Sequence, residues 1–221
     1  MEKVFIITPV FNGSKTIEKV LDSLLLHNYR NIVVVNDGSI DDTIERLKNY
    51  DVYTISHIVN LGQGAALRTG TEFALKLGAE TIVHFDADDQ HPADEIVKLL
   101  GKLAEGYDIA LGSRFIDNRT QMPWTKKYLI LKPAIMVNYL FSGLKLTDAH
   151  NGFRAMSRFA AEKIQINQNR MAHASEITSE IKRHGLKYAE VSVKIRYHQY
   201  GQNWKGGLKV IADLIKQRII N

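Results

Sequence analysis

The chain has 221 residues, of which 45% are hydrophobic and 24% are charged, so it can bury one sizeable core and is predicted to form one domain. It contains no cysteine, which excludes disulfide bonds and thiolate chemistry. The formal net charge of +5 favours anionic partners, and without zinc-finger spacing or an aromatic RNA-binding motif we expect nucleotide phosphates or acidic lipid rather than nucleic acid.

Apolar runs alternate with helix-spaced apolar residues through the first half of the chain. The runs predict buried strands at residues 4–9, 31–36, 52–59, 81–85 and 108–112. The segments between them predict amphipathic helices at residues 14–27, 41–50, 64–77 and 92–105. Strands and helices that alternate at this spacing predict an α/β fold, with a doubly wound, mostly parallel central sheet and helices on both faces.

The pattern changes after residue 112. Residues 113–132 have no clear period and carry the basic side chains Arg114, Arg119, Lys126, Lys127 and Lys132. Helices are predicted at 133–142, 158–164, 175–184 and 208–220, strands at 152–156 and 187–195, and a polar loop at 196–207. The apolar stretch 134–141 is most simply core.

Two segments of this second half also have the composition of membrane-surface segments. Residues 208–220 predict a basic amphipathic helix, and residues 126–141 combine lysines with an apolar run. The first ten residues become polar too soon for a signal peptide, and no apolar run approaches the roughly 20 residues that span a bilayer. We therefore expect a cytoplasmic protein that attaches peripherally to the inner face of the membrane.

An acidic cluster follows the predicted strand 81–85. Asp86, Asp88 and Asp89 come directly after it, followed by Gln90. Asp86 and Asp88 are two residues apart, so they point the same way in an extended chain. Carboxylate and amide oxygens suit Mg²⁺ or Mn²⁺. The sequence therefore predicts a metal site of Asp86, Asp88 and Gln90 at the sheet edge, and the alternative is a solvated acidic turn before the next helix.

Three other strand ends carry residues that suit a nucleotide. They read T-P-V-F-N at 8–12, N-D-G-S at 36–39 and N-L-G-Q-G at 60–64. Asp37 can accept hydrogen bonds from a base or ribose, while Gly62 and Gly64 precede a helix, where free N–H groups favour phosphate. Each motif alone is more typical of a structural turn. Together they predict a nucleotide across the sheet edge, with a metal on its diphosphate.

An ordered set of motifs gives the sequence a specific resemblance. The set is P-V-F-N at 9–12, N-D-G-S at 36–39, N-L-G-Q-G-A-A at 60–66, D-A-D-D-Q-H-P at 86–92, G-S-R-F at 112–115, N-G-F-R at 151–154 and R-Y-H-Q-Y-G-Q at 196–202. Over nearly its whole length the chain resembles the family-2 inverting glycosyltransferases of GT-A fold, and among them the polyprenyl-phosphate (dolichol-phosphate) sugar transferases. The resemblance implies one glycosyltransferase domain, 1–221, with a nucleotide-sugar half at 1–115 and an acceptor half at 116–221.

The resemblance also implies roles for the matching residues. The nucleotide site would comprise Pro9, Phe11, Asn12, Asp37, Gly62, Gly64, Asp86 and Arg196, the last on a loop with Gly201 that closes over the diphosphate. Asp86, Asp88 and Gln90 match the metal–diphosphate site, and Arg114 matches a basic residue that faces the acceptor phosphate. Two positions depart from the family pattern: Asn36 replaces a commoner Asp, and Gln63 replaces a frequent Lys.

The acceptor decides whether a catalytic base is needed. A hydroxyl acceptor must lose its proton to a carboxylate, whereas a lipid monophosphate, with a second pKa of about 6, is already anionic. Relatives with hydroxyl acceptors often carry an E-D pair at the start of a late helix, but residues 175–178 read S-E-I-T. This favours a phosphate acceptor. Glu176 and Asp148 remain candidate bases, although a helix-start acid and a loop acid are more often structural.

The leading hypothesis is metal-dependent transfer of a sugar from a nucleotide diphosphate sugar to a polyprenyl phosphate, with Asp88, Arg114, Asp148 and Glu176 as candidate catalytic residues. The alternatives are transfer to a hydroxyl of a glycan or glycolipid in cell-envelope polysaccharide synthesis, and a non-catalytic nucleotide- or lipid-binding module. The intact acidic set, Asp86, Asp88 and Gln90, argues against the non-catalytic module.

A sugar nucleotidyltransferase would need a Gly- and Arg-rich loop that residues 8–13 do not provide. The membrane helices of some relatives have no counterpart here, which leaves room for an integral-membrane partner.

Overall fold

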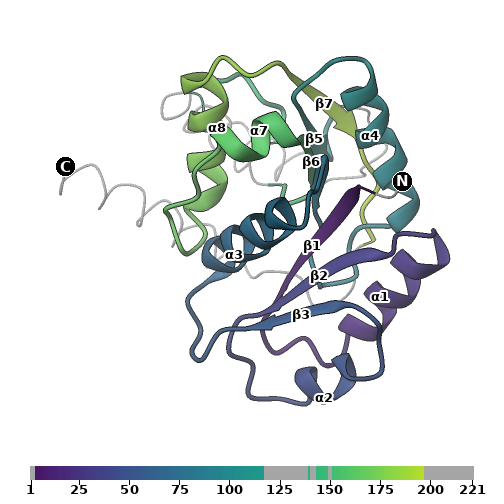
Figure 1. Cartoon of the computed structure of the whole chain (residues 1–221). Coiled ribbons are helices and arrows are strands. Elements are labelled where there is room, and N and C mark those ends of the chain that lie inside the picture. Colours follow the sequence, from purple (N-terminus) through teal and green to yellow (C-terminus); the bar gives the residue numbers. More distant parts are fainter. Residues whose placement is uncertain (1–2, 117–138, 140–142, 149–150, 197–221) are drawn as a thin grey trace, which may run out of the picture.

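One mixed sheet organises the computed structural model, which describes residues 3–116, 139, 143–148 and 151–196 (Figure 1). Its strands are β1 Val4–Val10, β2 Asn31–Asn36, β3 Tyr53–Ser56, β4 Thr81–His84, β5 Ile109–Ser113, β6 Arg154–Ser157 and β7 Tyr188–Ser192. Among the described residues they form a seven-stranded sheet in the order β3-β2-β1-β4-β6-β5-β7. All pairings are parallel except those of β6.

Helices cover both faces of the sheet. Their bounds are α1 Ile17–Leu26, α2 Thr43–Leu47, α3 Gln63–Lys76, α4 Ile96–Ala104, α7 Arg158–Lys163 and α8 His173–Arg183. Figure 1 shows α1 and α4 on one side of the sheet and α3, α7 and α8 on the other. In β2 the β-branched run alternates between the two cores: Ile32 and Val34 pack with α1, while Val33 packs with α3. The predicted α/β fold, with helices on both faces of a mostly parallel sheet, is therefore confirmed.

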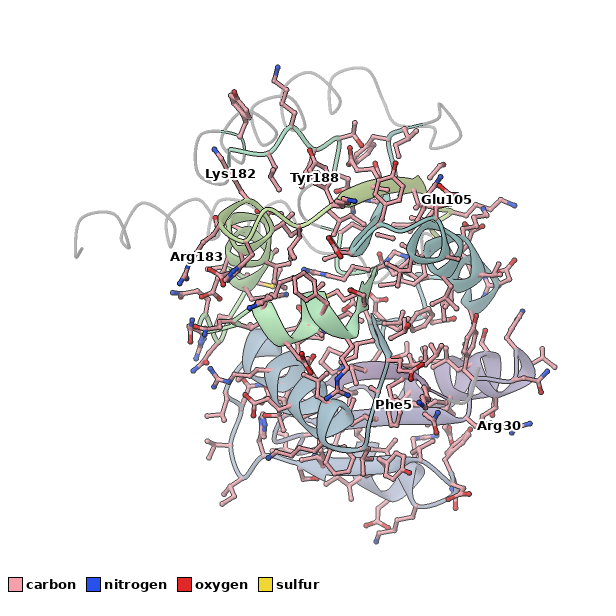
Figure 2. The ribbon with its side chains drawn as sticks, turned by 45° about the horizontal axis from the view of Figure 1, so that its top comes forward. Phe5, Arg30, Glu105, Lys182, Arg183 and Tyr188 are labelled. Atoms are coloured by element: carbon pink, nitrogen blue, oxygen red, sulfur yellow. The ribbon has the colours of Figure 1, made fainter. Side chains whose placement is uncertain are left out.

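The charged side chains lie mainly outside these cores. Figure 2 shows Arg30, Glu105 and Arg183 at the periphery, whereas Phe5 of β1 lies within the sheet. Phe5 is buried, and it packs in the same core as α3. Within the described part of the chain, no helix is both long and apolar enough to cross a membrane.

Several elements begin or end a few residues from their predicted bounds. The helix predicted at 14–27 starts at Ile17, and the one predicted at 41–50 spans only Thr43–Leu47. The cause is tertiary: the N–H of Gly13 donates to Oγ1 of Thr43, and that of Ser14 donates to Oδ2 of Asp41. These bonds tie together the two segments that precede α1 and α2, so the first residues adopt loop rather than helical geometry.

β6 is the exception in this mostly parallel sheet, among the strands that the structure describes. β6 lies between β4 and β5 and runs antiparallel to both. Because it is reversed, its amino end lies at the edge where the parallel strands have their carboxyl ends. Residues 151–153, which precede β6, therefore reach the same edge as the acidic cluster. The predictions for residues 133–142, 196–207 and 208–220 fall almost wholly outside the described residues.

Candidate active site

Asp86 is the centre of the acidic cluster, directly after β4 and Phe85. Nε2 of Gln63, at the start of α3, donates a hydrogen bond of 2.7 Å to Oδ1 of Asp86. Gly152 lies against the other oxygen, where an added Cβ would be only 2.5 Å from Oδ2. The carboxylate is thus held between α3 and the segment before β6. Sequence patterns did not indicate that Gln63 and Gly152 would enclose it.

A buried arginine supports this arrangement. Arg154 is 2% exposed, and its Nε donates to the carbonyl of Gly152 at 3.1 Å. Burial lowers the pKa of Arg154 to about 10, while nearby Asp86 acts in the opposite direction. Burial, and secondarily Asp88, raises the pKa of Asp86 to about 6. A poorly solvated carboxylate beside a second one is a favourable place for a cation.

The acidic loop also contacts the chain after β7. The N–H of Gln90 donates to Oδ1 of Asp88 at 3.0 Å. The carbonyl of Gln90 accepts the N–H of Arg196 at 2.8 Å, and the Arg196 guanidinium lies 3.7 Å from Oδ1 of Asp89. The structure therefore places Arg196 beside the predicted metal–diphosphate residues. Gly201, the other residue predicted for this closing loop, lies outside the described residues.

The donors present fit a hard divalent cation that shares a bound diphosphate. In the described ranges, no three His, Cys, Asp or Glu side chains form a group that could hold a metal ion. Mg²⁺, however, is usually bound through one or two carboxylates, with substrate phosphates and water as the remaining ligands. Asp86 and Asp88, whose charges interact, can provide those two carboxylates. Gln90 as a ligand stays a prediction.

The loops predicted to hold the nucleoside bind one another. Oδ1 of Asn12 accepts the N–H of Ile40, and the N–H of Asn12 donates to Oγ of Ser39, both at 2.9 Å. Pro9 lies within β1, beside Val35 of β2. Phe11, by contrast, is 50% exposed after the end of β1. Phe11 thus presents an exposed aromatic ring at this strand end.

Asp37 is almost completely buried and holds the turn before α3. Its Oδ1 is bonded to Nδ1 of His57 at 2.7 Å and accepts the N–H of Leu61 at 3.0 Å. Its Oδ2 accepts the N–H of Gly62 at 2.7 Å. The carboxylate therefore has a structural function in this turn. Its predicted contact with a nucleoside stays a prediction.

Replacing Asp37 with Ala should destabilise the protein as well as weaken nucleotide binding. The change removes the buried carboxylate that accepts the N–H groups of Leu61 and Gly62, and a hydrogen bond to a charged group contributes about 1.5–3 kcal/mol. We expect a loss of about 2 kcal/mol or more in the free energy of unfolding, measured by urea denaturation. The exposed Asp51 provides the control, since Asp51→Ala should leave that free energy unchanged. Equal stabilities of the two variants would contradict this function of Asp37.

Two backbone N–H groups at the start of α3 are bonded within the protein. The N–H of Gly62 is bonded to Asp37, and that of Ala65 donates to the carbonyl of Asn169 at 3.2 Å. A Cβ on Gly64 would lie 1.9 Å from the carbonyl oxygen of Gln168. Residues 168–169 thus cover the beginning of α3, and this close approach requires glycine. Contact of Gly62 and Gly64 with a nucleotide stays a prediction.

Glu176, a candidate base, holds this covering segment in place. Its Oε2 accepts the N–H groups of Asn167 at 2.9 Å and Gln168 at 2.8 Å. Glu176 lies in the first turn of α8, and the two donors belong to the segment that precedes this helix. This geometry favours the structural interpretation of Glu176 over the catalytic one.

Asp148, the other candidate base, is paired with Arg114. Nε of Arg114 donates to Oδ2 of Asp148 at 2.5 Å, and a terminal nitrogen donates to Oδ1 at 2.7 Å. The Asp148 side chain is 2% exposed, against 27% for Arg114. Both carboxylate oxygens are thus engaged by one guanidinium, which remains partly accessible after β5. This two-point contact indicates that Asp148 holds Arg114 in place, rather than acting as a catalytic base.

Arg114 also influences the acidic cluster. Its charge lowers the pKa of Asp86, against the stronger effect of burial. It contributes, after burial, to lowering the pKa of His91 to about 4. The neutral His91 ring packs on Phe153, with centroids 4.8 Å apart. The cluster therefore has carboxylates on one side and a fixed guanidinium within electrostatic range.

The sequence of this chain is similar to those of known glycosyltransferases. Residues 5–165 match the family model for glycosyl transferase family 2. An uncharacterized protein of Methanocaldococcus jannaschii is 39% identical, and the alignment covers 99% of this chain and 93% of that protein. The UDP-N-acetylglucosamine–dolichyl-phosphate N-acetylglucosaminyltransferase of Methanococcus voltae is 32% identical, with 96% and 94% covered. The polyprenol monophosphomannose synthase of Mycolicibacterium smegmatis is 25% identical, with 97% and 85% covered.

A solved structure shares the fold. It is the glucosyl-3-phosphoglycerate synthase of Mycobacterium tuberculosis in complex with Mn²⁺, UDP and glucosyl-3-phosphoglycerate. The TM-score is 0.72 at 19% identity, and the match covers 97% of this chain and 79% of that one. At this identity the likeness establishes the fold alone.

Proposed function

This chain belongs to glycosyl transferase family 2 and is a glycosyltransferase, and we propose that it transfers a sugar from a nucleotide diphosphate sugar to a polyprenyl phosphate, with Mg²⁺ or Mn²⁺. Two relatives support this acceptor, since one is named for transfer to dolichyl phosphate and another for polyprenol monophosphomannose synthesis. The proposal assigns residues 1–115 to the donor and 116–221 to the acceptor. It includes peripheral attachment to the inner face of the membrane, with or without an integral-membrane partner.

The observation that carries the proposal is the engagement of both candidate bases. Asp148 binds a guanidinium through both oxygens, and Glu176 binds two backbone N–H groups. Transfer to a hydroxyl needs a carboxylate that can take a proton, whereas an anionic phosphate acceptor needs none. The structure therefore favours the phosphate over the glycan or glycolipid hydroxyl.

The proposed reaction is one in-line displacement at the anomeric carbon. A phosphate oxygen of the acceptor attacks, the nucleoside diphosphate leaves, and the configuration inverts. Arg114, fixed by Asp148, would hold the acceptor phosphate so that one oxygen faces the anomeric carbon. Arg196, beside the acidic loop, would neutralise charge on the leaving diphosphate. A cation held by Asp86 and Asp88 would add further stabilisation of that charge.

A direct assay tests the proposal. The purified protein is incubated with a panel of UDP-, GDP- and dTDP-sugars, Mg²⁺ or Mn²⁺, and undecaprenyl phosphate, and the lipid fraction is examined for linked sugar. A parallel reaction replaces the lipid phosphate with a glycolipid that offers only hydroxyl groups. We expect lipid-phosphate-linked sugar from at least one donor. Transfer to the hydroxyl acceptor alone, or nucleotide binding with no transfer in either reaction, would contradict the proposal.

A further inference from the structure

A carboxylate on β7 connects the sheet to the Arg114–Asp148 pair. Oε1 of Glu190 accepts three hydrogen bonds from the segment that precedes Asp148. The donors are the N–H of Thr147 at 2.8 Å, Oγ1 of Thr147 at 2.8 Å and the N–H of Asp148 at 3.3 Å. No motif in the sequence indicated Glu190. In the sheet it lies beside Leu111 of β5, two residues before Ser113.

The hydroxyl groups of Ser113 and Thr147 form a chain of hydrogen bonds that ends on Glu190, and the donor of each bond can be assigned. Because the single proton of Thr147 Oγ1 goes to Glu190, the 2.6 Å contact between Ser113 and Thr147 must be donated by Ser113. Oγ of Ser113 in turn accepts the N–H of Phe115 at 3.2 Å. The residues on either side of Arg114 are therefore linked to the same carboxylate that holds Asp148. Such a chain fixes its members more firmly than isolated hydrogen bonds would.

We propose that Glu190 is a positioning residue for the acceptor phosphate, acting through Asp148 on the guanidinium of Arg114. This inference rests on the proposed function, because it takes Arg114 as the group that meets the phosphate. Asp148 is nearly fully buried, and Arg114 is partly accessible at the sheet edge. An arginine held in one plane by two bonds loses less conformational freedom when it binds an oxyanion. Glu190 fixes that plane from the sheet, without reaching the substrate itself.

A double-mutant cycle separates this function from a general effect on stability. Glu190→Ala should lower kcat/KM for undecaprenyl phosphate about tenfold through a higher KM for the acceptor, with the KM for the donor unchanged. In an Arg114→Gln background the same change should cost less than about twofold, because the group it positions is gone. Glu190→Gln, which keeps one acceptor oxygen, should restore most of the activity. Thr147→Val removes only the hydroxyl link and should give a smaller loss of the same kind.

Glu162 of α7 offers a matched control. Its carboxylate pairs with Arg158 at 2.7 Å and is 49% exposed, so Glu162→Ala removes an ion-paired acid without touching the Arg114 network. It should leave both KM values unchanged. Losses from Glu190→Ala and Arg114→Gln that simply multiply in the double variant, or an equal rise in both KM values, would overturn the inference.

A second measurement needs no activity. The Nε–H of Arg114, followed by ¹⁵N NMR, should exchange slowly with solvent because it is bonded to Asp148. Glu190→Ala should accelerate this exchange at least about tenfold, and Glu162→Ala should not. If the wild type transfers no sugar to undecaprenyl phosphate, the proposed function fails, yet accelerated exchange still supports the positioning by Glu190. Unchanged exchange in the Glu190 variant overturns the inference whatever the acceptor.

Discussion

Asp88→Asn is expected to lower the turnover of sugar transfer by at least about a hundredfold, because in the proposed mechanism Asp88 helps to hold the divalent cation that stabilises the leaving diphosphate. The fold should be preserved. Asp88 is exposed, and its Oδ1 accepts the N–H of Gln90, a bond that the Asn oxygen can also accept. Steady-state rates in Mg²⁺ and Mn²⁺, with the melting temperature measured in parallel, check both expectations.

The neighbouring Asp94 supplies the control for Asp88. It is exposed, lies in the 3-10 turn Ala93–Glu95, and Asp94→Asn should retain full activity. Excess EDTA should abolish transfer by the wild type, and added Mn²⁺ should restore it. An Asp88→Asn variant with wild-type turnover, or a wild type that is fully active in EDTA, would remove the metal from the mechanism.

Arg114→Lys is expected to reduce kcat/KM for the lipid phosphate about 10- to 100-fold, although the positive charge is kept. The guanidinium binds Asp148 through two nitrogens, and a lysine ammonium cannot reproduce that planar contact. Asp148→Asn should show a loss of the same kind, because it weakens the support of Arg114. Rates measured with undecaprenyl phosphate at saturating donor give the comparison.

Glu176→Gln is the informative counterpart of Arg114→Lys. Gln keeps an oxygen for the N–H groups of Asn167 and Gln168, so the variant should retain nearly all its activity and its pH profile. If the acceptor were a hydroxyl and Glu176 its base, the variant would lose orders of magnitude and one limb of that profile. A dead Glu176→Gln beside a healthy Arg114→Lys would refute the phosphate acceptor.

Much of the sheet was predictable because its strands are short apolar runs with helices between them. The run at Ile32–Val35 could only be a strand buried on both faces, and the structure shows it so. The direction of β6 was not predictable, since a four-residue strand carries no mark of which neighbour it pairs with. The predicted helix starts were wrong where a side chain distant in sequence accepts a backbone N–H group, as Thr43 accepts that of Gly13.

The candidate site also has a part that was predictable from the sequence and a part that was not. The acids were identifiable because they follow strands whose carboxyl ends must share one edge. Their partners were not, because residue types alone do not tell which side chains meet. Asp148 and Arg114 are 34 positions apart in sequence, and Gln63 and Asp86 are 23 apart. Glu190 had no recognisable signal, since a single acid in a strand of alternating polarity usually faces solvent.

The place of β6 in the sheet has a consequence for the order of folding. During synthesis the strands β1 to β4 emerge first and can assemble as a contiguous group, β3-β2-β1-β4. β5 emerges next but cannot join them, because its neighbours are β6 and β7. Until residue 157 has been made, β4 presents an unpaired edge, the kind that invites association between chains. β6, which is translated after β5, thus fills the place between β4 and β5, and its arrival removes the exposed edge of β4.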